Sequence, residues 1–339
     1  MIGLFGRWQR IALAACSILL IVSAPAFAWN DEGHMAIAFL AYQKLRPVTK
    51  SRVNALLKLN PYYTKWLAAL PAGTSQTDTD RMIFMIAATW PDQIRNDPAY
   101  ADDGPNNGNS PPNDPKASQN IGYADKFRHK YWHFVDIPFS QDGSALPAVP
   151  VPNIETQIAL FRAALSSGKS DDIKSYDLTW LEHLVGDVHQ PLHAVTRITA
   201  GNPEGDAGGN LVLLCSAPCR DELHFFWDRL VGSQSSIQPP PPIPPGRQVD
   251  TAAELESAAA AAKTLPSPKA ALANKMDGAG WVHESFLAAE GHVYVPPIGP
   301  GTGPYAITPE YFQTARELAT ERVALAGARL ANLLNKELK

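Results

Sequence analysis

Eleven residues near the middle of the chain, His183-Leu-Val-Gly-Asp-Val-His-Gln-Pro-Leu-His193, combine three histidines, an aspartate and a proline with apolar neighbours. On a helix, His183 and Asp187 are four residues apart and therefore lie on the same face. Pro191 has no amide hydrogen and its ring clashes with the preceding turn, so a helix must kink or end there. His193 would then point to a second position in space.

Two interpretations fit this segment. In an ordinary buried helix, each histidine would be satisfied by a hydrogen bond. In a metal site, a cation would offset the cost of desolvating three ionisable groups on one short apolar segment, which is why we favour this interpretation. Imidazole and carboxylate ligands suit zinc, with iron or manganese as weaker candidates.

Residues 1–28 are predicted to form a cleavable signal peptide. Arg7 and Arg10 form a positive region, residues 11–22 an apolar region, and Ala26–Ala28 a typical cleavage site. The apolar region is too short to span a bilayer by itself. The segment Leu13–Cys16 resembles a lipoprotein cleavage motif, but cleavage there would leave almost no apolar region before it. We therefore expect a periplasmic or secreted protein.

Cleavage after Ala28 would make Trp29 the mature N-terminus. The whole chain has 29 Lys and Arg against 33 Asp and Glu, and loss of Arg7 and Arg10 leaves 27 basic residues and a net charge of −6. Such a chain has no broad positive surface for nucleic acid. If the protein handles phosphates, bound metal must supply the local positive charge.

Helical spacing of apolar residues dominates the mature chain and predicts an all-α fold. We expect helices at Asp31–Lys44, Lys50–Lys58, Asp78–Thr89, Ile154–Leu165, Tyr176–Val188, Asp221–Val231, Ala252–Ala262, Lys269–Glu290 and Pro309–Glu337. Thr308 is the expected N-cap of the last helix, with Pro309 at its first position. Only Asn210–Leu214 has the pattern of a short strand or hairpin arm.

Two stretches are predicted to be long surface loops. The first, Asn96–Asn120, is rich in Asn, Asp, Gly and Pro, and the second, Gln238–Gly246, contains six prolines. Neither has the character of a domain linker, because candidate ligands lie on both sides of the first. Cys215 and Cys219 remain after signal cleavage, and in an oxidising compartment they favour a disulfide that closes a short turn. A zinc site built from these two cysteines alone would be incomplete.

Four further motifs carry metal-ligand chemistry. His224 and Asp228 repeat the four-residue spacing, and the others are Trp132-His133-Phe134-Val135-Asp136, Trp90-Pro91-Asp92 and Trp29-Asn-Asp-Glu-Gly-His34. Each motif alone also fits a capped helix or a polar loop.

Together, these motifs resemble the zinc-dependent type I nucleases of plants, fungi and bacteria, the S-one/P-one single-strand nuclease family. The resemblance runs from Trp29 to about Leu334 and includes Gly208-Gly209-Asn210. It implies a single nuclease domain over residues 29–339, a compact multi-helix fold of the phospholipase C/P-one nuclease type, with long loops and at most a short β-hairpin.

The resemblance also implies three Zn²⁺ ions. The first would be held by Asp92, His133, His183 and Asp187. The second would be held by His34, Asp187 and the α-amine and carbonyl oxygen of Trp29, and the third by His193, His224 and Asp228. In this arrangement Asp187 bridges two ions, and an uncleaved precursor lacks the complete site.

The implied activity is an endonuclease that hydrolyses single-stranded DNA and RNA to 5′-phosphorylated products, with 3′-nucleotidase activity. The two bridged zincs would lower the pKa of a shared water, and the resulting hydroxide would attack phosphorus while the third zinc stabilises the leaving 3′-oxygen. Asp92 and Asp187 would be catalytic through the metals. Arg95 would balance charge on the phosphate, although a surface arginine also fits that position.

Base recognition is expected to involve Phe134, Asp136 and Asn210. Phe134 would stack on an unpaired base and Asp136 would bond to it, which favours single-stranded substrates; core packing is the alternative for Phe134. Two observations lie outside the resemblance. Many relatives have Asn where this chain has Glu222, and His129, His189, His283 and His292 have no ligand counterpart, so we expect them at the surface or behind the ligands.

Two other functions remain open at this point. Zinc phospholipase C enzymes resemble this family in fold, but they use Glu where this chain has Asp228. A non-catalytic zinc-binding protein is the second alternative. For the nuclease we expect nucleic acid and 3′-nucleotides as substrates, a monomer, and no stable membrane association.

Overall fold

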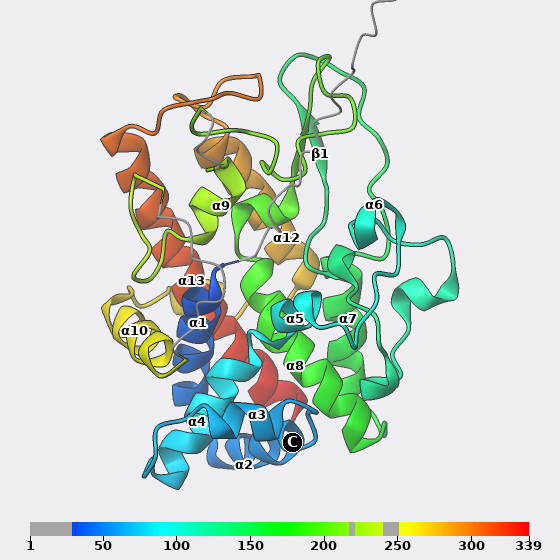
Figure 1. The fold of residues 1–339 in the computed structure, drawn as a ribbon, viewed down its shortest axis with the longest axis vertical. Coiled ribbons are helices and arrows are strands. Elements are labelled where there is room, and N and C mark those ends of the chain that lie inside the picture. The colour runs from blue at the N-terminus through cyan, green and yellow to red at the C-terminus, as the bar shows by residue number, and fades with distance from the viewer. Residues whose placement is uncertain (1–28, 217–220, 240–250, 339) are drawn as a thin grey trace, which may run out of the picture.

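The computed structural model describes residues 29–216, 221–239 and 251–338, and its α-helices except α11 are labelled in Figure 1. The helices are α1 (Asp31–Lys44), α2 (Pro47–Leu57), α3 (Tyr63–Ala68), α4 (Gln76–Ala87), α5 (Trp90–Gln93), α6 (Pro105–Gly108), α7 (Ile154–Leu165), α8 (Asp171–Asp187), α9 (Leu223–Asp228), α10 (Thr251–Thr264), α11 (Ala270–Ala273), α12 (Gly278–Ala288) and α13 (Pro309–Glu337). Shorter helical turns are η1 (Ile94–Asn96), η2 (Pro115–Ser118), η3 (Gly122–Ala124), η4 (Lys130–Trp132), η5 (Pro191–Ala194) and η6 (Ala289–Val293).

Helix α8 lies at the centre of the fold, and every residue from Ser175 to Asp187 is buried. Helices α1, α2, α7 and α13 pack against it (Figure 1). The ring of Trp180 meets Trp132 and Trp90 edge-on, at centroid distances of 5.0 and 6.2 Å. Such aromatic pairs contribute about 0.5–1.5 kcal/mol beyond the area they bury. This packing fixes the helix that carries His183 and Asp187.

Helices α1 and α13 lie side by side and approach closely at Gly327 (Figure 1). A Cβ atom at this position would lie 2.8 Å from the Cβ of Leu40 and 3.1 Å from the carbonyl oxygen of Ile37. The missing side chain therefore sets the spacing of the two helices. Within the described residues, no helix is both long enough and apolar enough to cross a membrane.

The mostly α-helical fold predicted from the sequence is confirmed, and the ends of α1, α7 and α13 match the expected ones. Thr308 caps α13 as expected, since its side chain accepts a hydrogen bond from the amide of Tyr311. The single helix expected at Lys269–Glu290 is wrong: α11 and α12 are separate. Asp277 between them accepts from the amide of Gly280 and so begins a new helix.

The β-structure differs from the expectation. Strands β1 (Pro138–Ser140) and β2 (Thr196–Ile198) form a parallel pair with Phe139 opposite Arg197, rather than a hairpin. The arm expected at Asn210–Leu214 is only a single antiparallel bridge between Leu213 and Glu222. It stays this short because Leu213 bonds instead to the backbone of Thr302 and Tyr305.

The first predicted loop, Asn96–Asn120, lies at one edge of the molecule and contains α6 and η2 (Figure 1). The prolines after Pro239 in the second loop, the signal peptide and Cys219 lie outside the described residues. The Cys215–Cys219 disulfide and signal cleavage after Ala28 therefore stay predictions.

Candidate metal centre

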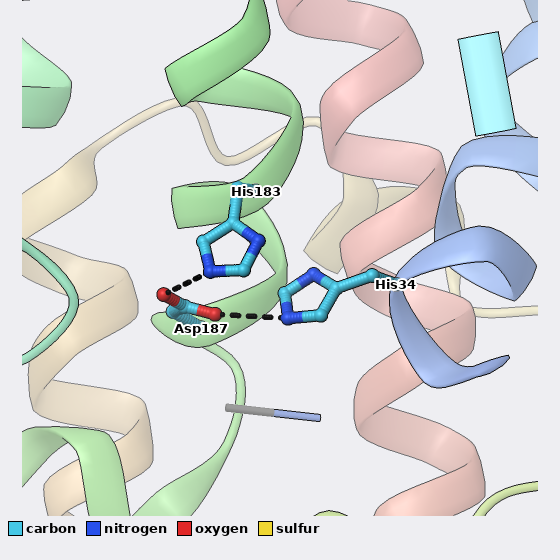
Figure 2. Close-up of side chains that lie close together, drawn as sticks. All are labelled: His34, His183 and Asp187. Atoms are coloured by element: carbon cyan, nitrogen blue, oxygen red, sulfur yellow. Dashed lines mark ion pairs between the residues drawn. The ribbon is translucent and has the colours of Figure 1, made fainter. Parts of the chain in front are cut away.

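The first group of side chains at the centre consists of His34, His183 and Asp187, all of them fully buried. Helix α8 presents His183 and Asp187 on one face, and α1 brings His34 against them (Figure 2). Oδ1 of Asp187 lies 3.2 Å from Nε2 of His34, and Oδ2 lies 3.2 Å from Nε2 of His183. The two carboxylate oxygens therefore face two different imidazoles, and the two rings stack at 3.9 Å.

Close packing of α1 on α8 depends on Gly186. A Cβ atom there would lie 2.8 Å from Nδ1 of His34. The carbonyl oxygen of Gly186 also accepts the indole N–H of Trp29 at 3.0 Å. A single glycine thus admits His34 to the site and anchors the first described residue.

The second group, Asp92, His133 and His183, shares a histidine with the first. Nδ1 of His133 lies 2.9 Å from Nε2 of His183 and 3.1 Å from Oδ2 of Asp187. Asp92 comes from α5, which begins at Trp90 shortly after the end of α4 and has Pro91 in its first turn. Its carboxylate lies 3.9 Å from His133 and 3.8 Å from His183.

The third group, His193, His224 and Asp228, lies beyond Pro191. Helix α8 ends at Asp187, and Pro191 opens the separate turn η5 that carries His193. The Nε2 atoms of His193 and His224 are 3.1 Å apart, and Oδ2 of Asp228 is 3.6 Å from His224. His193 thus serves a different group from His183, as the proline predicts.

Backbone carbonyls fix the orientation of three of these rings. Nδ1 of His183 donates to Ala88, Nδ1 of His193 to His133, and Nδ1 of His224 to Gly208, at 2.8, 2.7 and 2.7 Å. A neutral ring that donates through Nδ1 carries a lone pair on Nε2. These lone pairs all point into the groups described above, which is how metal-ligating histidines are oriented.

Burial sets the charges of these groups. It lowers the pKa of His133 to about 4 and that of His224 to about 3, so both rings are neutral at pH 7. Burial alone would raise the pKa of Asp187, but the neighbouring His183, His133 and His34 outweigh it and hold the pKa well below the usual range. The centre therefore offers neutral imidazoles at His133 and His224 beside the ionised carboxylate of Asp187. Burial would lower the pKa of His183, but Asp187 and Asp92 outweigh it and raise that pKa to about 9.

The donor set fits a cation. Several buried ligand atoms of the three groups make no hydrogen bond within the described residues: Oδ2 of Asp92, Oδ2 of Asp228, and the pair Nε2 of His34 and Oδ1 of Asp187, which lie 3.2 Å apart without hydrogen-bond geometry. Leaving such atoms without a partner is costly, and two lone pairs facing each other repel. Neutral imidazole nitrogen and carboxylate oxygen are the ligand types that zinc takes.

Trp29 lies against this centre but supplies no side-chain ligand atom. Its ring is fully buried, and the amide of the next residue, Asn30, donates to the carbonyl oxygen of Asp228 at 3.0 Å. Trp29 and Asn30 are thereby held between the ends of α8 and α9. Whether its α-amine is a ligand stays a prediction.

Arg95 lies beside the second group, with Nη1 3.2 Å from Oδ1 of Asp92.

The sequence analysis missed two residues near the centre. Gln190 donates to Oδ1 of Asp228 at 2.6 Å, and its place inside the His183–His193 segment was the available signal. Burial, together with the neighbouring carboxylate of Asp92, raises the pKa of Asp31 to about 7.

Of the three residues expected to bind a base, two share a small pocket. Phe134 and Asp136 line it together with Asn109, Ser110, Pro111, Tyr131, Pro150, Pro152 and Asn153. Burial, and then the carboxylate of Asp206, raise the pKa of Asp136 to about 7. Asn210 is not among the lining residues; its side chain donates to the carbonyl oxygen of Ala207 in its own turn.

The other histidines divide into two pairs. His283 and His292 are exposed. His129 and His189 are fully buried, so of the two expected positions, at the surface or behind the ligands, only the second remains for them. His189 lies behind the centre, where its Nδ1 donates to Val185 and its Nε2 accepts from Arg329.

Glu222 is buried at the N-terminus of α9, next to the third group. Burial raises the pKa of its carboxyl to about 7, with a further contribution from the charge of Asp221.

Comparison with known proteins agrees with this geometry. The family model described as S1/P1 Nuclease matches residues 29–339. Endonuclease 4 and Endonuclease 5 of Arabidopsis thaliana are each 36% identical to the chain over 70 residues, which is 20% of this chain and 21% of either relative. The match thus spans about a fifth of the length of these relatives. With the family model covering the chain from Trp29 to its end, the protein belongs to the S1/P1 nuclease family.

Proposed function

We propose that the protein is an exported, zinc-dependent endonuclease that hydrolyses single-stranded DNA and RNA to 5′-phosphorylated products and also removes phosphate from 3′-nucleotides. The observation that carries this proposal is the convergence of three His/Asp groups, two of them sharing His183, around buried ligand atoms without hydrogen-bond partners. Such multinuclear sites are suited to in-line displacement at phosphorus.

The proposed ligand sets are the ones that the resemblance implies. Asp92, His133, His183 and Asp187 would hold one zinc; His34, Asp187 and the Trp29 backbone a second; and His193, His224 and Asp228 a third. When bound, the ions supply positive charge for the phosphate and acidify a water molecule near neutral pH. The placement of the two Asp187 oxygens toward His34 and His133 supports the bridging role.

The remaining residues orient the reaction. The carbonyls of Ala88, His133 and Gly208 hold three imidazoles in one tautomer, so their ligand atoms need no rearrangement on binding. Arg95, next to Asp92, would balance charge on the phosphate. Phe134 would stack on an unpaired base while Asp136 bonds to its edge, because both line the same pocket.

Export is part of the proposal. A free α-amine at Trp29 requires removal of residues 1–28, so the second site would be complete only after signal cleavage. We further propose that the enzyme acts as a monomer in the periplasm or outside the cell, with Cys215 and Cys219 disulfide-bonded.

The test compares substrates on the mature protein. We expect a single-stranded oligonucleotide to be cleaved faster than the same sequence as a duplex, with 5′-phosphate on the new ends. Phosphate release from 3′-AMP tests the nucleotidase activity. Hydrolysis of phosphatidylcholine without cleavage of DNA or RNA would overturn the proposal in favour of a phospholipase C, and zinc binding without phosphodiester hydrolysis would favour a non-catalytic role.

A further inference from the structure

Three consecutive basic residues, Arg128, His129 and Lys130, bind the beginning of the long loop. Nη1 of Arg128 lies 3.2 Å and Nζ of Lys130 lies 2.9 Å from Oδ1 of Asp102. Lys130 also donates to the carbonyl oxygen of Asn107 at 2.7 Å. These contacts join two segments more than twenty residues apart in the sequence.

His129 is held between two carboxylates. Its Nδ1 lies 2.6 Å from Oδ2 of Asp103, and its Nε2 lies 2.8 Å from Oδ2 of Asp125. A neutral ring donates from only one nitrogen, so the ring satisfies both carboxylates only as an imidazolium. Burial disfavours that charge, but Asp103 and Asp125 outweigh it and raise the pKa of His129.

The same histidine is tied to the segment that leads into the metal centre. Its ring stacks on Trp132 with centroids 3.6 Å apart and 9° between the planes. His129 also adopts a left-handed backbone conformation with φ of 44°, which is unfavourable for a residue with a side chain. The backbone amide of His129 donates a hydrogen bond to Oδ1 of Asp103, and this bond helps to hold the conformation.

The loop held in this way forms one wall of the pocket that contains Phe134 and Asp136. Asn109, Ser110 and Pro111 line that wall, two to four residues after Asn107. In the segment that contains Lys130, two other lining residues follow: Phe134 four residues later and Asp136 six residues later. The contacts therefore connect the two chain segments that carry these lining residues, and they involve none of the proposed metal ligands.

We propose that Arg128, His129 and Lys130, paired with Asp102 and Asp103, form a latch that holds the Asn109–Pro111 wall in place and thereby sets the affinity for the base of a single-stranded substrate. This inference rests on the proposed function. If the wall is already ordered in the free protein, binding does not have to supply the free energy needed to order it. Loosening the wall therefore weakens binding of the base without changing chemistry at the phosphate. The latch residues are positioning residues, since none of them touches the reacting atoms.

The test uses two substrates and matched variants. Lys130→Met removes the contacts to Asp102 and Asn107 from a side chain near the surface, and His129→Gln removes the buried charge. Lys58→Met changes an exposed lysine elsewhere and is the control. The substrates are a single-stranded oligonucleotide and an oligonucleotide of abasic units with the same phosphodiester backbone.

We expect Lys130→Met to raise KM for the oligonucleotide by roughly tenfold, which is the size of effect expected when its charge-assisted contacts to Asp102 and Asn107 are lost. Its kcat, zinc content and KM for the abasic strand should equal those of wild type and of Lys58→Met. His129→Gln should raise KM further, and faster proteolysis within residues 104–118 should report the released loop.

Two results would overturn the latch. One is an unchanged oligonucleotide KM in Lys130→Met; the other is an equal loss of kcat on both substrates, which would indicate a merely structural role. If His129→Gln fails to fold, Lys130→Met and Asp102→Asn still decide the question. Failure of wild type to cleave either substrate would instead overturn the proposed function.

Discussion

His193 and His224 face each other through their Nε2 atoms at 3.1 Å, while the Nδ1 atom of each donates to a backbone carbonyl. Two lone pairs at this distance repel unless a proton or a cation lies between them. Burial lowers the pKa of both rings, and His193 lowers that of His224 further, so a shared proton is disfavoured at neutral pH. A bound cation would remove the repulsion and couple metal binding to folding.

Metal removal is therefore expected to destabilise the fold. Each site adds about 4 kcal/mol to the free energy of unfolding when free zinc is a thousand times its Kd. Dialysis against a chelator should lower the melting temperature in calorimetry and abolish nuclease activity, and zinc should restore both. Magnesium serves as the control ion, since it prefers oxygen ligands. An unchanged melting temperature in the chelated protein would contradict the coupling.

Asp187→Asn is expected to affect two metal sites at once, because Oδ1 faces His34 and Oδ2 faces His133. We predict at least a hundredfold loss of kcat/KM and a fall in bound zinc, measured by mass spectrometry of the metal content. Asp177→Asn is the matched control. Asp177 is buried on the same helix, but it accepts a hydrogen bond from the side chain of Asn120 and is not one of the proposed ligands. Equal activities in the two variants would count against the bridging role.

Gly186→Ala tests the close approach of α1 to α8. The new Cβ would lie 2.8 Å from Nδ1 of His34, so the ring must leave its present position, in which Nε2 lies 3.2 Å from Asp187. We expect a ten- to hundredfold loss of activity, comparable to that caused by altering the orientation of a metal ligand. Gly168→Ala is the control, because a Cβ atom at Gly168 would have no other atom within 4 Å. Wild-type activity of Gly186→Ala would show that His34 does not require this position.

Asp136 is expected to make stability depend on pH. Its pKa rises from 3.8 to about 7 on folding, so the folded state binds the proton more tightly than the unfolded state. The contribution of this group is fully present below pH 3.8 and is lost as pH rises toward 7. In Asp136→Asn, the free energy of unfolding from urea titrations should fall less between pH 4 and pH 7 than in wild type. Parallel pH profiles of the two proteins would contradict the assignment.

The sequence predicts those parts of the fold that local signals specify. Thr308 caps α13 at the expected residue, and the helical spacing of the apolar residues in α7 predicts both of its ends. The break at Asp277 was missed because apolar spacing continues on both sides of it. The pairing of β1 with β2 was also missed, since it joins residues almost sixty positions apart and leaves no local pattern.

In the candidate site, too, the sequence predicts what local signals specify. The four-residue spacing of His183 and Asp187 predicts their shared face, and Pro191 predicts the separate position of His193. The placement of His129 between two aspartates could not be predicted, because it depends on the path of the Asn96–Asn120 loop. A lone histidine in the sequence does not reveal whether its partners are solvent or buried carboxylates.

The central claim is that three zinc ions occupy this centre and that one of them depends on a free Trp29 amine. The most direct measurement is the zinc content per chain of the exported protein, with N-terminal sequencing of the same sample. We predict three zinc ions per chain, a mature start at Trp29, and two ions with little nuclease activity when an extra residue precedes Trp29. Full activity with a different N-terminus, or with fewer than three zinc ions, would contradict the account.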